Sequence, residues 1–269
     1  MTEAVVSLPV YRRMDFDAVE TVNREGTGPL LFICEHASNA IPAEFGTLGL
    51  SEEARVSHIA WDPGARELAL RLCGVFNAPL VTSRISRLVY DCNRPPESAA
   101  AMPARSEIFD IPGNCSLSSA AKARRIEMVY RPFQETIREI IDTRTLRGLA
   151  TVVVTVHSFT PVYEGQARDV EVGIIHDLDR RMADAMLATA PKISTRKIER
   201  NKPYDASDGV THTLEFFGTA DQRANVMIEV RNDLLATPSD IQSVAAELNV
   251  LLTSGLRSLG LLAEEVANV

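Results

Sequence analysis

Groups that can bind a metal or an anion follow three apolar runs of this chain. His36, His157 and the pair Asn93-Arg94 each come at or just after the end of such a run. Imidazoles bind transition metals, and the planar fork of an arginine matches a carboxylate. Because ligands bind beyond the carboxyl ends of the strands in open α/β sheets, these groups are expected at one edge of a sheet. A hydrolase site is the leading hypothesis.

A catalytic zinc commonly takes three protein ligands from His and Asp or Glu and keeps a fourth position for water. His36 and His157 supply two ligands, and Asp62 is our choice for the third. Each has a plainer explanation: a single His beside a strand is often structural, and Asp before Pro is typical of a helix N-cap. Glu35 is the alternative, either as a ligand or as a group that orients a histidine. Asn39 carries a neutral amide, which is a poor zinc ligand.

An anion-binding site is predicted around Arg94. Arg84, Arg87 and Arg94 lie within eleven residues. Apolar flanks favour an anion site over a solvated charged loop, and Asn93 adds a hydrogen-bond donor beside Arg94. Arg84 and Arg87 are further candidates for substrate binding. His212, in a polar stretch that could cover a substrate or merely connect two elements, is another.

Glu229 places a carboxylate inside the apolar run 226–230. Burial of an unpaired carboxylate is costly, so this group needs a positive partner, a metal-bound water or a raised pKa. A carboxylate of this kind can act as the general base of metal-assisted hydrolysis. The structural alternative is an ion pair with Arg231, which would lie on the same face of the strand. Arg231 is also kept as a candidate for substrate binding.

The elements that must position these groups alternate along the chain. Apolar, β-branched runs predict strands, and helical periodicity with start signals predicts helices. Pro132 either kinks its helix or starts a second one. The predicted strands are 30–34, 79–83, 150–156, 170–175 and 226–230, and the predicted helices are 51–59, one from Asp62-Pro63, 118–143, 179–189 and 239–259. This alternation predicts an α/β fold whose central sheet, mostly parallel or mixed, carries helices on both faces.

Length and charge limit the remaining choices. The 269 residues contain no linker or repeat, so one α/β domain over residues 1–269 is expected. The net charge of −8 argues against nucleic-acid binding, which needs a basic patch. Residues 1–10 lack an export signal, no run is long enough for a membrane span, and the four cysteines are widely separated. A cytoplasmic protein with reduced thiols and no membrane partner is expected, and its oligomeric state stays open.

The polar groups together resemble one known family. The single motifs are weak, but their joint order over roughly residues 30–260 is similar to the N-formylglutamate amidohydrolase family, which is related to the zinc carboxypeptidases and aspartoacylases. The motifs are His36, Asp62, Asn93-Arg94, His157-Ser158-Phe159 and Glu229-Val230-Arg231-Asn232. The resemblance implies a zinc-exopeptidase-like α/β hydrolase of amino-acid metabolism. It would cleave the small anionic substrate N-formyl-L-glutamate to formate and glutamate.

The resemblance also implies roles for single residues. His36, Asp62 and His157 match the zinc positions, Glu229 matches the general base, and Asn93-Arg94 match the carboxylate site. The chain departs from the wider zinc carboxypeptidase pattern in lacking Glu at position 39. It also has Cys34-Glu35 before His36, where many deformylating members have a Pro. These departures leave the third ligand, Asp62 or Glu35, and the acyl group open.

Two other functions are compatible with the same residues. A related amidohydrolase or carboxypeptidase-like enzyme could act on another N-acyl amino acid or a small peptide, because pocket volume sets that preference. A non-catalytic binding protein for an acidic metabolite is the second alternative. The native metal is open as well, since His and carboxylate ligands also accept manganese, cobalt or iron.

Overall fold

A seven-stranded sheet with strand order β1-β3-β2-β6-β11-β9-β10 forms the centre of the fold. The computed structural model describes residues 17–262. Strands β3, β2, β6 and β11 are mutually parallel, whereas β1 and β9 are antiparallel to the neighbours β3 and β11, and β10 is parallel to β9. The strands of the sheet are β1 (Val19–Val22), β2 (Leu30–Cys34), β3 (Leu80–Ser83), β6 (Val152–Phe159), β9 (Val172–Ile175), β10 (Ile198–Arg200) and β11 (Asn225–Arg231). The predicted mostly parallel or mixed sheet is therefore confirmed.

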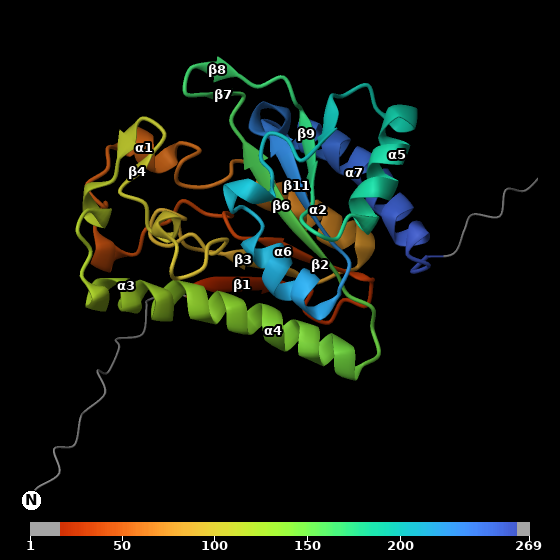
Figure 1. The fold of residues 1–269 in the computed structure, drawn as a ribbon, viewed down its shortest axis with the longest axis horizontal. Coiled ribbons are helices and arrows are strands. Elements are labelled where there is room, and N and C mark those ends of the chain that lie inside the picture. Colours follow the sequence, from red (N-terminus) through yellow and green to blue (C-terminus); the bar gives the residue numbers. More distant parts are fainter. Residues whose placement is uncertain (1–16, 263–269) are drawn as a thin grey trace, which may run out of the picture.

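Helices cover both faces of this sheet (Figure 1). Helices α2, α5 and α7 pack on one face, and α4 and α6 pack on the other. The helices are α1 (Glu52–Val56), α2 (Ala65–Phe76), α3 (Ser119–Arg125), α4 (Arg131–Leu146), α5 (Arg181–Ile193), α6 (His212–Phe217) and α7 (Pro238–Ser258). Two small hairpins, β4–β5 (Arg105–Ser106 and Phe109–Asp110) and β7–β8 (Val162–Tyr163 and Gln166–Ala167), lie outside the sheet.

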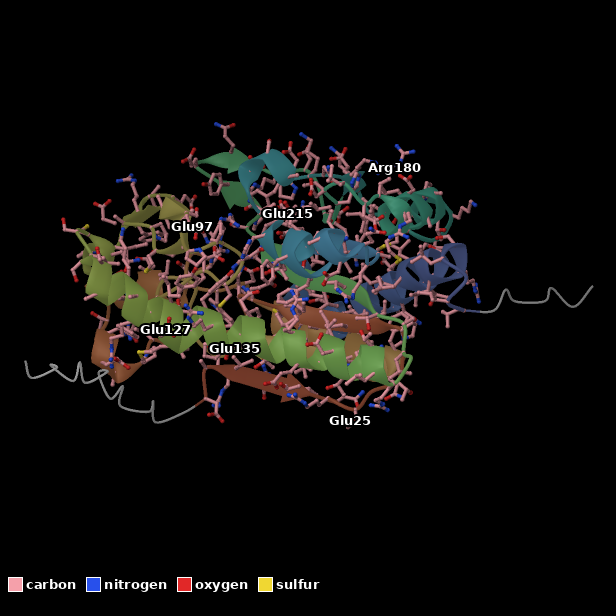
Figure 2. All side chains as sticks on the ribbon, turned by 60° about the horizontal axis from the view of Figure 1, so that its bottom comes forward. Glu25, Glu97, Glu127, Glu135, Arg180 and Glu215 are labelled. Atoms are coloured by element: carbon pink, nitrogen blue, oxygen red, sulfur yellow. The ribbon has the colours of Figure 1, made fainter. Side chains whose placement is uncertain are left out.

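Short helical turns link several of these elements. A π-helical turn at Ile126–Tyr130 joins α3 to α4. Acidic side chains such as Glu127 and Glu135 are exposed along this stretch, as Figure 2 shows. The 3-10 turns are Ala43–Phe45, Ala99–Ala101, Pro112–Asn114, Ala206–Asp208, Thr219–Asp221 and Asn232–Leu235.

Among the described residues, no helix combines the length and apolar character that a bilayer span requires.

Strand β2 shows why the apolar runs are readable in the sequence. Leu30 and Phe32 pack among the residues of α2, whereas Leu31 and Ile33 pack among those of α4. A strand that is buried on both faces has no polar side to expose, so its sequence is continuously apolar. The same alternation places the side chains of β6 and β11 that carry chemistry on the face covered by α4 and α6.

Most predicted elements are present with shifted ends. Strand 30–34 is confirmed residue by residue, and the predicted helix 118–143 is divided into α3, the π-helical turn and α4, with Pro132 in the first turn of α4. Helix α1 ends at Val56, so His58 lies in the following turn. The predicted helix start at Asp62 is wrong, because Gly64 is the N-cap of α2. Residues 1–10, on which the prediction about export depends, lie outside the described residues.

Arg144 fixes the point at which the two central strands begin. Its side chain is 1% exposed, and burial lowers its pKa. The guanidinium donates to the carbonyl oxygens of Gly26 and Gly28 before β2, and to the carbonyl of Ala150 and the hydroxyl of Thr151 before β6. One buried cation thus satisfies four acceptors on two chain segments that are far apart in sequence.

We expect Arg144→Met to lower the free energy of unfolding by about 3 kcal/mol or more, because each buried acceptor left without a partner costs about 1–3 kcal/mol. Arg147→Met is the matched control, since Arg147 is more exposed and pairs with the exposed Glu25. Exposed ion pairs contribute about 0–1 kcal/mol. Urea unfolding followed by circular dichroism measures both values, and equal losses in the two variants would contradict the role of Arg144.

Candidate active site

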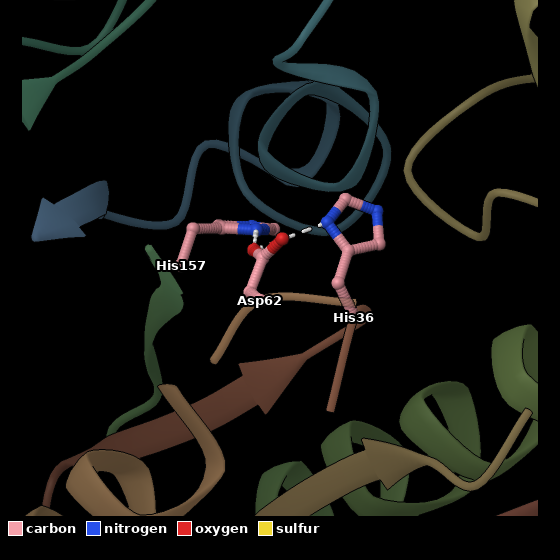
Figure 3. A group of neighbouring side chains, drawn as sticks. All are labelled: His36, Asp62 and His157. Atoms are coloured by element: carbon pink, nitrogen blue, oxygen red, sulfur yellow. Dashed lines mark hydrogen bonds and ion pairs between the residues drawn. The ribbon is translucent and has the colours of Figure 1, made fainter. Parts of the chain in front are cut away.

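Two histidines and an aspartate converge at the edge of the sheet (Figure 3). Oδ2 of Asp62 lies 3.2 Å from Nδ1 of His36 and 2.9 Å from Nδ1 of His157. All three side chains are buried. One ligand atom from each lies within 4.8 Å of the other two. The group that the sequence predicted as metal ligands is therefore assembled in one place.

Hydrogen bonds to the backbone hold Asp62 in this position. Its amide nitrogen donates to the carbonyl oxygen of His36 over 2.9 Å. The amide nitrogen of Ser158 donates to its carboxylate over 3.3 Å, and the hydroxyl of Ser158 donates to the carbonyl oxygen of Pro63. The carboxylate of Asp62 thus faces β2 and β6 and does not cap α2, which removes the N-cap explanation for this residue.

Two further carboxylates face the outer nitrogens of the histidines. Oδ1 of Asp91 lies 2.7 Å from Nε2 of His36. Oε2 of Glu35 lies 3.2 Å from Nε2 of His157, without hydrogen-bond geometry. Carboxylates in this position orient metal-binding histidines in many proteins. Glu35 thus lies across the ring of His157 from Asp62, which matches an orienting group better than a third ligand.

Arg87 connects the carboxylates of this cluster. Its Nη1 donates to Asp62 over 3.4 Å and its Nη2 donates to Asp91 over 2.8 Å. Burial lowers the pKa of Arg87, but the two carboxylates raise it by more, so the guanidinium stays charged. Burial likewise raises the pKa of Asp91, but His36 and Arg87 hold it well below its usual value. Both terminal nitrogens of Arg87 therefore donate to carboxylates of the cluster.

The charge of the cluster suits a bound cation. Glu35, Asp62, Asp91 and Glu229 are all buried, and Arg87 is the arginine that pairs with two of them. Neither oxygen of Glu35 has a hydrogen-bond partner in the described part of the chain. Buried carboxylates are costly unless they are paired or coordinate a metal. A set of two imidazoles and a carboxylate fits zinc, manganese, cobalt or iron.

The same carboxylates act on the histidines. Burial alone would lower the pKa of His157, but Glu35 and Asp62 raise it well above its usual value. Burial also opposes protonation of His36, but Asp91 and Asp62 raise its pKa. Excess negative charge therefore surrounds both rings, and a divalent cation would offset it in place of bound protons.

Glu229 lies beside His157 in the parallel pair β11–β6, where the two residues are register partners. Its side chain is buried and lines the same cavity as the histidines. Desolvation raises the pKa of Glu229 to about 7. A carboxyl group with such a pKa can both take up and release a proton near neutral pH.

The cavity beside the cluster has a volume of about 210 Å³ and a wall of mixed polar and apolar character. Arg94 lines it, donates to the carbonyl oxygen of Asn93, and forms no ion pair with any described residue. Asn93 also lines it, but its amide group bridges to the α6 side of the molecule: Nδ2 donates to the carbonyl of Val210 and Oδ1 accepts from the backbone of Thr213. The remaining lining residues are His36, His58, Ile59, Asp62, Arg87, Ser106, Glu107, His157, Ser158, Phe159, Thr160, Tyr163, Tyr204, Val210 and Glu229.

Three predicted substrate-binding residues lie outside this wall. Arg84 is exposed and lines a separate surface hollow with Glu20. His212 accepts or donates a hydrogen bond at the hydroxyl of Tyr130, 2.9 Å away. Arg231 pairs with Asp233 over 2.8 Å, so the alternative ion pair with Glu229 is not formed.

Asp91 and Tyr204 are among the residues at or beside the cavity that sequence reasoning missed. Asp91 orients His36, and its only signal is its place at the end of the apolar run before Asn93-Arg94. Tyr204 lines the cavity and lies just before the polar stretch around His212, for which a substrate-covering loop is one prediction. Neither signal separates these residues from ordinary loop positions, because the placement of both residues depends on contacts between segments that are distant in the sequence.

Comparison with known proteins gives a family and a fold. The family model described as N-formylglutamate amidohydrolase matches residues 28–236. The crystal structure of a gene product from Agrobacterium tumefaciens is 50% identical, with a TM-score of 0.89 over 91% of this chain and 97% of the other. An N-formylglutamate amidohydrolase from Ralstonia eutropha shares the fold at 17% identity, with a TM-score of 0.65 over 91% of this chain and 99% of the other. A comparison with curated proteins gives no match.

The raised pKa of Glu229 predicts a change in stability with pH. In metal-stripped protein the folded-state pKa of about 7 exceeds the ordinary value of 4.5. The folded state therefore holds an extra proton between these values, and wild-type stability falls as the pH rises through this window. Gln does not titrate, so Glu229→Gln gains stability relative to the wild type by up to about 3 kcal/mol on going from about pH 5 to about pH 8.

Urea unfolding of the metal-stripped proteins at the two pH values measures this gain. Glu135→Gln, at an exposed position of α4, controls for the general loss of one negative charge. A difference between wild type and Glu229→Gln that is the same at both pH values would contradict the raised pKa.

Proposed function

Because the chain belongs to the N-formylglutamate amidohydrolase family, as its ordered polar motifs indicated, we propose that it is a metal-dependent amidohydrolase. The substrate would be N-formyl-L-glutamate, cleaved to formate and L-glutamate, or a similar N-acyl amino acid. The observation that carries the proposal is the convergence of the buried His36–Asp62–His157 group with Glu229 and Arg94 on one cavity.

His36, Asp62 and His157 would hold the metal, with Asp91 and Glu35 as the groups that orient the two rings. Zinc is the cofactor that the family resemblance implies. Bound there, such a metal would supply Lewis acidity, which polarises a carbonyl and makes a water molecule more acidic. Arg87 would keep the carboxylates of Asp62 and Asp91 ionised and in place.

Glu229 would act as the general base and then as the general acid. It would take a proton from the attacking water and deliver it to the leaving nitrogen, for which a pKa near neutrality is suited. Arg94 would bind a carboxylate of the substrate, because it lines the cavity and pairs with no described carboxylate. Asn93 would hold the loop of Arg94 against the α6 side of the cavity.

The size of the cavity supports a small substrate. A volume of about 210 Å³ suits a short acyl group on one amino acid better than a long peptide. Related N-acyl amino acids or small peptides remain the closest alternative substrates. We also propose a cytoplasmic location, which the four free cysteines support, because a reducing compartment keeps thiols unpaired.

The decisive experiment is formate release from N-formyl-L-glutamate by metal-stripped protein with and without added zinc. We expect release only after zinc is added, because the buried carboxylates and imidazoles would bind it. N-acetyl and larger N-acyl glutamates, and N-formyl derivatives of other amino acids, then rank the acyl group and the amino acid. Folded, zinc-loaded protein that cleaves none of them would favour the binding-protein alternative.

The third metal ligand can be assigned by zinc stoichiometry. We expect Asp62→Ala to lose stoichiometric zinc, because Asp62 faces Nδ1 of both histidines. Glu35→Gln should still bind one zinc but about 10–100-fold more weakly, as expected for a group that orients a ligand. Elemental analysis and competition with a chelator measure both values on proteins shown to be folded by circular dichroism. The reverse order of the two variants would assign the ligand to Glu35.

A further inference from the structure

Tyr204 reaches the cavity wall from the loop that follows β10, and a close approach of backbones holds this loop in place. A Cβ atom at Gly173 would lie only 1.9 Å from the carbonyl oxygen of Lys202 and 3.3 Å from Cβ of Glu229. Gly173 is also the register partner of Glu229 in the antiparallel pair β9–β11. Only a glycine there lets the loop lie against β9 beside Glu229.

The hydroxyl of Tyr204 has a fixed donor on one side. Nη1 of Arg168 lies 3.0 Å from the hydroxyl oxygen, and an arginine can only donate hydrogen bonds. The oxygen of Tyr204 therefore accepts this bond. No described residue accepts a hydrogen bond from the hydroxyl proton of Tyr204, so this proton is available to a molecule in the cavity.

Aromatic rings fix Arg168 in turn. Its guanidinium carbon lies 4.5 Å from the ring centre of Tyr163, 4.9 Å from that of Tyr204 and 5.6 Å from that of Phe159. Arg168 is half-buried and forms no ion pair with a described carboxylate, so the three rings and the hydroxyl of Tyr204 are the groups that hold its guanidinium. A charged donor on a phenol oxygen makes the hydroxyl proton a better hydrogen-bond donor.

The hydroxyl stays protonated at neutral pH. Burial and the carboxylate of Glu229 raise the pKa of Tyr204, Arg168 lowers it, and together they bring it to about 12. A neutral hydroxyl that is held by Arg168, on a residue that lines the cavity, is a preorganised donor of the kind that stabilises charge that develops during a reaction.

We propose that Tyr204 is a catalytic residue that donates a hydrogen bond to the oxyanion formed at the scissile carbonyl, and that Arg168 is its positioning residue. This role rests on the proposed amide hydrolysis in the cavity. The proton stays on the oxygen of Tyr204 throughout, so the hydroxyl lowers the barrier by charge stabilisation and leaves the proton transfers to Glu229.

Tyr204→Phe tests this role, because it removes the hydroxyl and keeps the ring that covers Arg168. With the best N-acyl amino acid as substrate, we expect kcat to fall by about 10–1000-fold, as for the loss of one oxyanion donor, with KM almost unchanged. Affinity for a phosphonamidate analogue of the tetrahedral intermediate should fall by a similar factor, whereas affinity for the product amino acid should not change.

Tyr130→Phe is the matched control. Tyr130 is also partly buried and bonded through its hydroxyl, to His212, but it does not line the cavity. We expect its kcat to equal that of the wild type. Zinc content and melting temperature of both variants, measured in parallel, show whether either substitution disturbs the fold or the His36–Asp62–His157 group.

A double-mutant cycle with Arg168→Met tests the coupling, and Arg168→Met by itself tests the role if Tyr204→Phe does not fold. Arg168→Met alone should lower kcat by about 3–10-fold, because the hydroxyl remains but loses its orientation. In the Tyr204→Phe background it should have no further effect on kcat. Arg168→Lys, which keeps a donor, should restore part of the loss.

The outcomes separate this role from the proposed function. A wild-type enzyme that cleaves no N-acyl amino acid would overturn both. An active wild type with an unchanged kcat for Tyr204→Phe, or with a change in KM alone, would overturn only the oxyanion role of Tyr204. Additive effects of the Tyr204 and Arg168 substitutions on kcat would overturn the positioning role of Arg168.

Discussion

Buried negative charge is the constraint on which the arrangement of this molecule depends. Four carboxyl groups, those of Glu35, Asp62, Asp91 and Glu229, lie out of solvent at one edge of the sheet. In a medium of low polarity, such charges destabilise the fold unless cations or donors face them. Arg87 and two imidazoles provide part of this compensation, and a divalent metal would provide the rest. The features that make the site costly for folding are thus the ones that suit it to hold a metal.

The sheet tolerates this charge because its central strands are fixed at both ends. Arg144 binds the segments that lead into β2 and β6, and the continuously apolar strands pack between two layers of helices. His36 and His157 then emerge from adjacent parallel strands at a fixed separation. Asp62 closes the group through backbone hydrogen bonds to both segments. Rigid elements therefore position the three candidate metal ligands, as precise coordination would require.

Patterns in the sequence predicted the features that depend on neighbouring residues, such as a strand that is buried on both faces. The run at 30–34 is buried on both faces, so strand β2 and the approximate place of His36 could be predicted, and Glu229 stood out as a carboxylate in an apolar strand. Asp62 was a candidate ligand, but the competing N-cap explanation could be removed only by seeing its carboxylate face β2 and β6. The packing of distant loops determines where Asp91 and Tyr204 lie and why Arg84 points outward. The periodicity of apolar residues does not predict such packing.

The sheet and the loops position different residues of the site. A match to the family therefore does not by itself identify the substrate. The candidate metal ligands and Glu229 belong to the sheet and its edge, whereas Arg94 and Tyr204 come from loops that contact one another through side chains such as Asn93. Loops vary more easily than the scaffold that carries them. A chain can therefore keep the side chains that its sheet positions while its loops change which ligand fits. Tyr204 comes from one of these loops, but its hydroxyl would meet the charge that develops at the scissile bond. A substitution of Tyr204 would therefore change the rate of the reaction and not only which substrate fits.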